Sequence, residues 1–241
     1  MPLRTHYAAG TPCWVDCITP DLTASQAFYA ALLGWEFTTE ASGYQLATLG
    51  GHIVAGFGAS PAGMPPNATW NVYLATKDAD HTCLQVGRLG GRVVMNPVPA
   101  GDDGRLFLAV DPSGVVVGFW EGHHDRGVVL ADEPGAVSGH ELRVPDAARA
   151  ARFYGELFGY RLASDEEQPE LELEGTARAR VVESDQGRPL WLPYFGAADP
   201  ADAVRRALAG GATVIRSGPG EPTVLRDPFG AEFGLTAVTT P

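Results

Sequence analysis

The chain is poor in basic residues, cysteines and long apolar runs, and each shortage removes a class of protein. Its 241 residues include 17 Lys and Arg against 29 Asp and Glu, for a net charge of −12. No basic run is longer than the Arg205–Arg206 pair. Because nucleic acids and anionic membranes are bound through clustered basic side chains, the sequence predicts neither as a partner.

The three cysteines form neither an even disulfide set nor a CxxC pair. Cys13 and Cys17 fall in one expected strand and on one face, where residues four apart lie ~13 Å from each other, too far to bridge. We therefore expect reduced thiols in the core. The first residues lack the apolar segment of a signal peptide, and no apolar run has the length of a membrane span. These absences predict a cytoplasmic protein.

What the chain does contain is an internal repeat. The segment "FYAALLGWEF" at 28–37 matches "FYGELFGYRL" at 153–162, and "DPSGVVVGFW" at 111–120 corresponds to "DPFGAEFGLT" at 227–236. The matches keep their order while their offset falls from 125 to 116, as loop deletions in a second copy would produce. The sequence therefore predicts a duplicated unit.

The repeat divides the chain into two modules of the same design. We expect residues 1–122 and 138–241 to form the modules and residues 123–137 to link them. Each module opens with a strand, at 13–19 or 139–144, and continues with a helix and further strands of alternating pattern. The fold class expected is therefore α+β.

Residues typical of helix ends bound the first helix of each module. Asp21 and Asp146 are suited to cap the first turn, and Gly34 and Gly159 stand where a C-terminal cap is expected. In the rest of the first module, the patterning and the glycines predict a Gly50–Gly51 hairpin within 44–57, a strand at 70–76, a helix at 79–89, and two strands near 92–96 and 105–120.

The ordered set of motifs resembles one known superfamily. The set comprises a strand, Pro-Asp before a helix that ends in "FYxxLxG", a later strand that ends in Asp, then "GG" and "DPxG". In this order it resembles the glyoxalase / bleomycin-resistance / extradiol-dioxygenase superfamily, also called vicinal oxygen chelate proteins. More narrowly, "GTPCWVD" and "DPSGVVVGFW" are similar to two-module glyoxalase-like proteins of actinobacteria, some of them labelled hydroxylases. The resemblance implies tandem βαβββ modules whose strands curl into one cup between them, with helices outside and the ligand inside.

The resemblance also implies where metal-using relatives hold their ligands. Counted from the motifs, those positions in this chain are Trp14, Gly139, Asn71, Leu192, Gly118 and Gly234. None is a His, Asp, Glu or Cys, and a divalent ion needs such donors. We therefore expect no metal there and no cofactor, and we interpret Gly118 and Gly234 as space for the body of a ligand.

Strand alternation predicts the side chains that line the cup. If Trp14 points inward then so does Asp16, with Glu141 and Arg143 inward in the second copy. The outward residues are then the apolar Val15, Cys17, Leu142 and Val144, which face the helices. The expected ligand-binding residues are Trp14, Asn71, Tyr73, Gly118, Trp120, Arg143, Tyr194 and Gly234. The matching carboxylates Asp16 and Glu141 are the candidate catalytic residues, because a buried carboxylate is costly unless paired or functional. Core packing of the aromatics and pairing of Glu141 with Arg143 are the structural alternatives.

Three functions remain open for this cup. The favoured one is metal-independent binding of an aromatic or polyketide-like small molecule by a monomer or homodimer, as in antibiotic biosynthesis or resistance. The second is a metal-free hydroxylase, cyclase or isomerase in which Asp16 or Glu141, with a pKa raised by burial, is the general base. The third is a metal-dependent lyase or dioxygenase with displaced ligands, using Asp16, Glu141 and His140.

Overall fold

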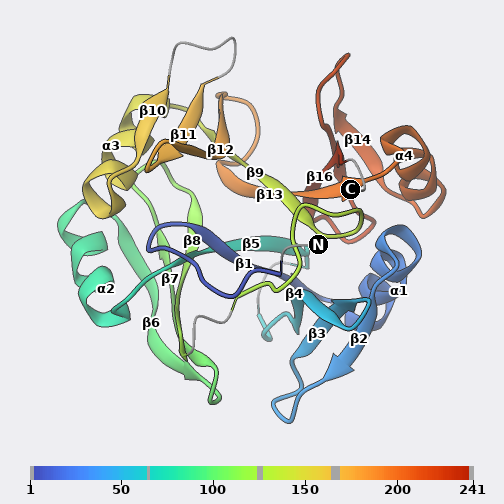
Figure 1. Ribbon diagram of the computed structural model, residues 1–241, viewed down its shortest axis with the longest axis horizontal. Helices are drawn as coiled ribbons and strands as arrows, with labels where there is room; N and C mark the ends of the chain where they lie inside the picture. Colours follow the sequence, from blue (N-terminus) through green and yellow to red (C-terminus); the bar gives the residue numbers. More distant parts are fainter. Residues whose placement is uncertain (1–2, 64–65, 124–126, 164–168, 239–241) are drawn as a thin grey trace.

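The computed structural model describes residues 3–63, 66–123, 127–163 and 169–238, which form two eight-stranded sheets and four helices (Figure 1). In the first module the elements are β1 (Pro12–Thr19), α1 (Leu22–Leu33), β2 (Glu36–Thr39), β3 (Gln45–Leu49), β4 (His52–Ala59), β5 (Thr69–Ala75), α2 (Ala79–Arg88), β6 (Arg92–Ala100), β7 (Gly104–Val110) and β8 (Val116–Gly122). Residues 124–126 of the expected linker lie outside the described part.

The second module repeats this order. Its elements are β9 (Val137–Val144), α3 (Ala147–Phe158), β10 (Arg161–Ala163), β11 (Glu170–Leu173), β12 (Thr176–Glu183), β13 (Leu190–Ala197), α4 (Pro200–Ala209), β14 (Thr213–Arg216), β15 (Thr223–Arg226) and β16 (Glu232–Ala237). The strand orders are β2-β3-β4-β1-β5-β8-β7-β6 and β10-β11-β12-β9-β13-β16-β15-β14. The α+β class and the tandem arrangement are confirmed, and each module contains the βαβββ unit twice.

The second βαβββ unit of each module was only partly anticipated. The two strands expected near 92–96 and 105–120 are three, because a turn at Asp111 separates β7 from β8. The Asp111 carboxylate accepts hydrogen bonds from the backbone N–H groups of Ser113 and Val115, at 2.8 and 2.9 Å. Gly114 takes the left-handed conformation with φ of 91°, which a glycine adopts without strain. The Asp-Pro-x-Gly motif is therefore a turn between neighbouring antiparallel strands.

The expectation of one cup closed between the modules is wrong. In the described residues, strands β1–β8 form one sheet and strands β9–β16 form the other. Figure 1 shows the first sheet below the second, with α2 and α3 on one side and α1 and α4 on the other. Two βαβββ units are enough to complete a curved sheet, so each module has an inner face of its own.

The modules pack against each other through their outer faces. Helix α1 contacts α4, α2 contacts α3, and β13 contacts β5. Phe195 of β13 packs on the rings of Trp35 and Trp70, with centroids 5.3 and 5.2 Å apart. Val15 and Leu142, which alternation assigned to the outer faces, are at most 1% exposed in this shared core. The predicted strand register is therefore confirmed along β1 and β9.

Cys13 departs from that register, so it does not share a face with Cys17. Cys17 lies in the shared core, whereas Cys13 contacts Tyr73 in an apolar cluster on the inner side of the first module. A bulge between Pro12 and Trp14 shifts the pairing of β1 with β5 and turns Cys13 inward. Both thiols are free and buried, as expected, but they do not share a face.

Two matching hydrogen-bond chains join the modules. The Tyr29 hydroxyl of α1 donates to Asp227 of the second module at 2.9 Å and accepts from Trp70 at 2.8 Å. The Tyr154 hydroxyl of α3 donates to Asp111 of the first module at 2.9 Å, and Trp191 donates to it at 2.8 Å. The repeated "FY" and "DPxG" motifs therefore hold each helix to the turn of the other module.

The predicted helix ends are confirmed. The side chains of Asp21 and Asp146 accept hydrogen bonds from the first turns of α1 and α3. Gly34 and Gly159 end these helices with φ of 76° and 87°, in the left-handed region that favours glycine. Within the described residues, no helix combines the length and the apolar character needed to cross a bilayer.

Candidate functional site

The first carboxylate cluster lies on the inner face of the first sheet. Asp16 of β1 is 4% exposed and accepts hydrogen bonds from Asn71 at 2.8 Å, Tyr73 at 3.0 Å and Tyr44 at 3.2 Å. Trp14 donates through its indole nitrogen to the Tyr44 hydroxyl at 3.2 Å. We call these residues the Asp16 cluster: Trp14, Asp16, Tyr44, Asn71 and Tyr73. Four of them were predicted to face inward together.

Tyr44 was missed by the sequence analysis. It immediately precedes β3, and its ring crosses the inner face of β4 at Gly56. A Cβ at Gly56 would overlap the Tyr44 hydroxyl and ring. In the sequence, the feature that could have indicated this contact is Gly56 on the neighbouring strand, because a residue without a side chain leaves room for a ring.

The Asp16 carboxyl has an unusual affinity for protons. Burial raises its pKa to about 6, although the hydrogen bonds from Asn71, Tyr73 and Tyr44 lower it in part. Among the described residues Asp16 forms no ion pair, so neutral donors alone hold its charge. A carboxyl with this pKa exchanges a proton near neutral pH, which suits a general base or a partner for a phenolic hydroxyl.

The glycines at the implied metal positions are filled by tyrosine rings. Tyr73 pairs with Gly118 across β5 and β8, and Tyr194 pairs with Gly234 across β13 and β16. A Cβ on either glycine would overlap the ring of its partner tyrosine. The interpretation that these glycines leave space for a ligand body is therefore wrong, because the ring that donates to the carboxylate occupies that space.

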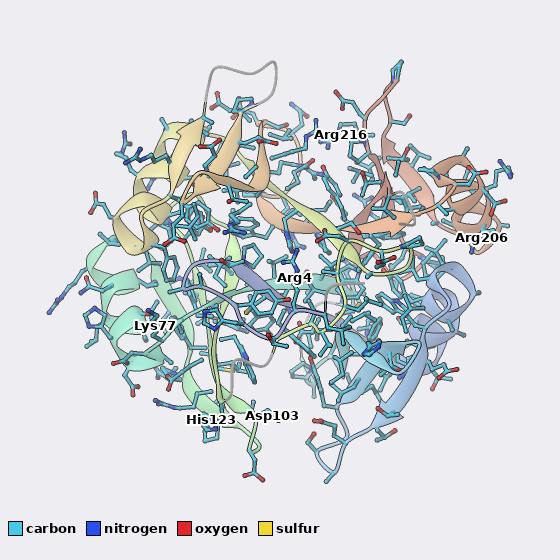
Figure 2. All side chains as sticks on the ribbon, viewed as in Figure 1. Arg4, Lys77, Asp103, His123, Arg206 and Arg216 are labelled. Carbon is cyan, nitrogen blue, oxygen red and sulfur yellow. The ribbon has the colours of Figure 1, made fainter. Side chains whose placement is uncertain are left out.

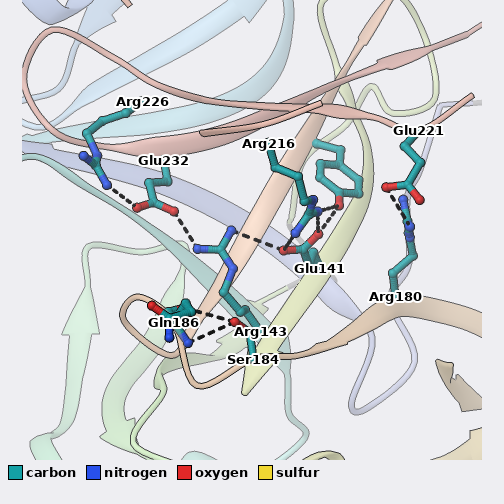
Figure 3. Close-up of polar contacts among 10 residues, drawn as sticks. Glu141, Arg143, Arg180, Ser184, Gln186, Arg216, Glu221, Arg226 and Glu232 are labelled. Atoms are coloured by element: carbon teal, nitrogen blue, oxygen red, sulfur yellow. Dashed lines mark hydrogen bonds and ion pairs between the residues drawn. The ribbon is translucent and has the colours of Figure 1, made fainter. Parts of the chain in front are cut away.

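The second carboxylate cluster is an ion-pair network (Figure 3). Glu141 of β9 is fully buried and accepts hydrogen bonds from Arg143 at 3.3 Å, from Arg216 and from the Tyr194 hydroxyl. Arg143 also donates to Glu232 at 2.8 Å, and that carboxylate pairs with Arg226 at 3.0 Å. The alternative that Glu141 pairs with Arg143 is confirmed.

Arg216 and Glu232 were not predicted from the sequence. Arg216 ends β14 and Glu232 begins β16, and both strands lie beyond β13 from the Glu141 strand β9. Arg216 belongs to no repeated motif, and Glu232 lies in the repeated segment 227–236 where the first copy has Val116. Only the curvature of the sheet brings them together.

The network fixes the charge of Glu141. Burial raises its pKa, but hydrogen bonds from Arg216 and Tyr194 and the positive charges of Arg216 and Arg143 outweigh burial, and the net pKa is lowered. The raised pKa expected for both carboxylates is therefore right in direction for Asp16 and wrong for Glu141. The two matching positions hold a carboxyl that titrates near neutral pH and a permanent anion.

The predicted site residues divide between the modules. Trp14, Asp16, Asn71, Tyr73, Gly118 and Trp120 belong to the first sheet, and Glu141, Arg143, Tyr194 and Gly234 to the second. Trp14, Tyr73 and Trp120 share one apolar cluster, which contributes the walls of a cavity of about 260 Å³. This cavity is lined by Trp120, Tyr7, Cys13 and Ala75, with polar side chains such as Lys77 and Glu121. Trp14 and Tyr73 of the Asp16 cluster thus pack in the same apolar cluster as the walls of this aromatic cavity, without lining it themselves.

The residues present do not fit the divalent metal of metal-using relatives. Asp16 is the sole carboxylate of its cluster, and both of its oxygens already accept hydrogen bonds. The displaced set of Asp16, Glu141 and His140 is not assembled, because the two carboxylates lie in different sheets. Across the described ranges, no three His, Cys, Asp or Glu side chains are grouped to hold an ion. We derive no chemical step through a metal.

Comparison with known families agrees with this architecture. Residues 12–119 match the model of the glyoxalase/bleomycin resistance protein/dioxygenase superfamily, and residues 140–236 match the model of a glyoxalase-like domain. The chain belongs to this superfamily. Its two family matches fall on the two sheets.

Particular relatives cover almost the whole chain. A putative glyoxylase, CFP32, from Mycobacterium tuberculosis is 33% identical over 98% of this chain and 97% of its own length. The anthracycline biosynthesis protein DauV from a Streptomyces species is 32% identical over 96% of this chain and 94% of its own length. The Mn(II)-bound glyoxalase from Novosphingobium aromaticivorans has the same fold, with a TM-score of 0.66 at 17% identity over 95% of this chain and 82% of that one.

Proposed function

We propose that this protein binds a planar aromatic, polyketide-like molecule in the first module and does so without a divalent metal at the superfamily's usual positions. The observation that carries the proposal is the Asp16 cluster beside the aromatic cavity. Trp120 and Tyr7 offer flat apolar walls, and the cavity of about 260 Å³ opens against the same cluster that contains Tyr73. Aromatic walls with a few polar groups are typical of sites for small aromatic ligands.

The polar part of the site selects for hydroxyl groups. Asp16 is held by neutral donors and has a pKa of about 6, so its carboxylate accepts a hydrogen bond from a phenol without an opposing cation. Tyr44 and Tyr73 are the side chains that a ligand hydroxyl would replace at Asp16. The proposal is also supported by two relatives that are anthracycline biosynthesis proteins, 32% identical to this chain.

A second candidate function is supported by the same carboxyl. A group with a pKa of about 6 removes a proton from a substrate near neutral pH, so Asp16 is suited to be the general base of a metal-free enzyme. Glu141 is not suited to this role, because its arginine partners hold its pKa below the usual value. The two candidate functions use the same site. They differ in whether the bound molecule is released unchanged or is converted to a product.

Titration with 1,8-dihydroxyanthraquinone, followed by calorimetry and tryptophan fluorescence, tests the proposal. We expect saturable one-to-one binding by the wild type and affinities at least about tenfold weaker in Trp120→Ala and Asp16→Asn, which corresponds to about 1.4 kcal/mol. Leu84→Ala and Asp185→Asn, at exposed positions, are the matched controls and should bind as the wild type does. Equal affinity in all variants, or no saturable binding, would reject the proposal. Loss of probe turnover in Asp16→Asn with binding retained would favour the enzyme.

A further inference from the structure

A second cavity of about 180 Å³ lies between the modules, and Trp14 of the Asp16 cluster belongs to its lining. It forms where the start of β1, the segment before β9 and the start of β12 meet, and we call it the seam cavity. Its polar lining comprises Arg4, Thr11, Asp132, Ser138, His140 and Arg178. Figure 2 shows Arg4 between the two sheets. At about 30 Å³ per water, the cavity has room for roughly six waters or one small organic molecule.

Two polar atoms of the lining are buried without a partner. The Thr11 hydroxyl belongs to a residue that is 6% exposed and has no hydrogen-bond partner, and Arg178 Nε is also buried and unpartnered. Leaving such a group unsatisfied is costly because it has lost its water, so native structures usually pair it with protein, water or ligand. Both atoms belong to residues that line the seam cavity, and both can donate a hydrogen bond. The cavity is therefore suited to a ligand that carries a hydrogen-bond acceptor.

The charged side chains around the cavity favour a ligand with a single negative charge. Arg4 is neutralised at the rim by Asp132 at 2.6 Å. In the described part of the chain Arg178 has no carboxylate partner, so one positive charge is left over. Burial and the nearby charge of Arg4 lower the pKa of His140 to about 3, and this imidazole is therefore a neutral donor and acceptor at pH 7. A dianion would exceed the charge that the site offers.

The rest of the lining is apolar. Pro12, Val128 and Val137 form part of the wall, and Trp14 is also among the lining residues. A bare inorganic ion would leave these surfaces against water, whereas an organic body would cover them. The wall therefore favours an acid with an apolar body.

We propose that the seam cavity binds a small organic monocarboxylate, whose carboxylate accepts hydrogen bonds from Arg178 Nε and the Thr11 hydroxyl. The apolar body of the acid lies against Pro12, Val128 and Val137. This site neighbours the aromatic cavity of the first module, with which it shares Tyr7 and Cys13, but it does not depend on the function proposed for that cavity. It places residues of both modules on one ligand.

Calorimetry and thermal unfolding with benzoate test this site, with acetate and inorganic phosphate compared at constant ionic strength. We expect benzoate to bind saturably to the wild type and to raise its melting temperature. Acetate should bind more weakly, because it lacks the apolar body. Phosphate that binds more tightly than benzoate would overturn the proposal.

Variants of the lining decide whether benzoate occupies the seam cavity. Arg178→Gln should weaken benzoate at least about tenfold and Thr11→Val about threefold or more. Arg149→Gln removes the same charge from an exposed helix position and should bind as the wild type does. Arg178→Lys keeps the charge without Nε and should also bind weakly, so the test stands if Arg178→Gln does not fold. No saturable binding, or equal affinity in the Arg178 and Arg149 variants, would overturn the proposal.

Discussion

At the scale of single residues, the two matching carboxylates show how neighbours decide the chemistry of a repeated position. Asp16 is surrounded by neutral donors, and its pKa rises to about 6. Glu141 is surrounded by arginines, and its pKa falls. The same position in the two modules therefore holds an acid in both, and its neighbours give one a proton to exchange and the other a lowered pKa.

The raised pKa of Asp16 predicts how stability changes with pH. Between about pH 4 and 6 the folded protein keeps a proton on Asp16 that the unfolded chain has released, so the free energy of unfolding falls as pH rises through this range. A pKa change from 3.8 to about 6 corresponds to about 3 kcal/mol. We expect Asp16→Asn to remove this fall, as measured by urea unfolding at pH 4, 5, 6 and 7.

The control for this prediction is Asp185→Asn, an exposed carboxylate whose loss should leave the pH profile unchanged. An Asp16→Asn profile parallel to that of the wild type would contradict the raised pKa. Stability of the variant near the wild type at pH 4 is also expected, because the wild-type carboxyl is itself protonated there.

At the scale of elements, the helices and turns of the repeat stabilise the contact between modules rather than the ligand sites. Tyr29 and Tyr154 each bridge a tryptophan of their own module and an aspartate of the other. Both hydroxyls are fully buried with their partners. The motifs by which the duplication is recognised in the sequence are therefore the ones that hold the two modules together.

Removing either hydroxyl should destabilise the protein measurably. Tyr29→Phe and Tyr154→Phe each leave a buried indole N–H and a buried carboxylate oxygen without this partner, at about 1–3 kcal/mol per group. The two variants share no partner, so their losses should add within about 0.5 kcal/mol in the double variant. Chemical unfolding gives these values. Tyr7→Phe, which loses one hydrogen bond to the Val128 carbonyl, is the control and should cost about 1 kcal/mol. Losses no larger than that of the control would contradict the bridging role.

At the scale of the whole molecule, the shared core couples the two sheets. The core cluster runs without a break from Val15 and Trp70 of the first module to Leu142 and Phe195 of the second. Separating the modules would expose this apolar surface and break both tyrosine chains. The two inner faces are structurally separate, but the modules that carry them depend on one core.

The shared core predicts a single unfolding transition. We expect scanning calorimetry to give one endotherm in which the calorimetric and van't Hoff enthalpies agree, near 170 kcal/mol for a chain of this length at about 60 °C. Ellipticity and tryptophan fluorescence should follow the same curve. Two resolved endotherms, each with about half of the enthalpy, would show that the modules unfold independently.

The local features of this protein could be predicted from its sequence. Helix ends at Asp21 and Gly34, the alternation that buries Val15, and the duplication itself are set by short-range chemistry and could be predicted. The inward grouping of Trp14, Asp16, Asn71 and Tyr73 also followed from alternation, because side chains on one strand face repeat every second residue.

Which faces close on each other depends on tertiary packing. Alternation alone is compatible with one cup shared by both modules, whereas each sheet curves on its own and keeps Asp16 apart from Glu141. Tyr44, Arg216 and Glu232 reach the carboxylates from distant strands, and the Cys13 bulge reverses a face. Curvature, bulges and contacts between remote strands carry no periodic signal in the sequence, because they depend on how the elements pack together.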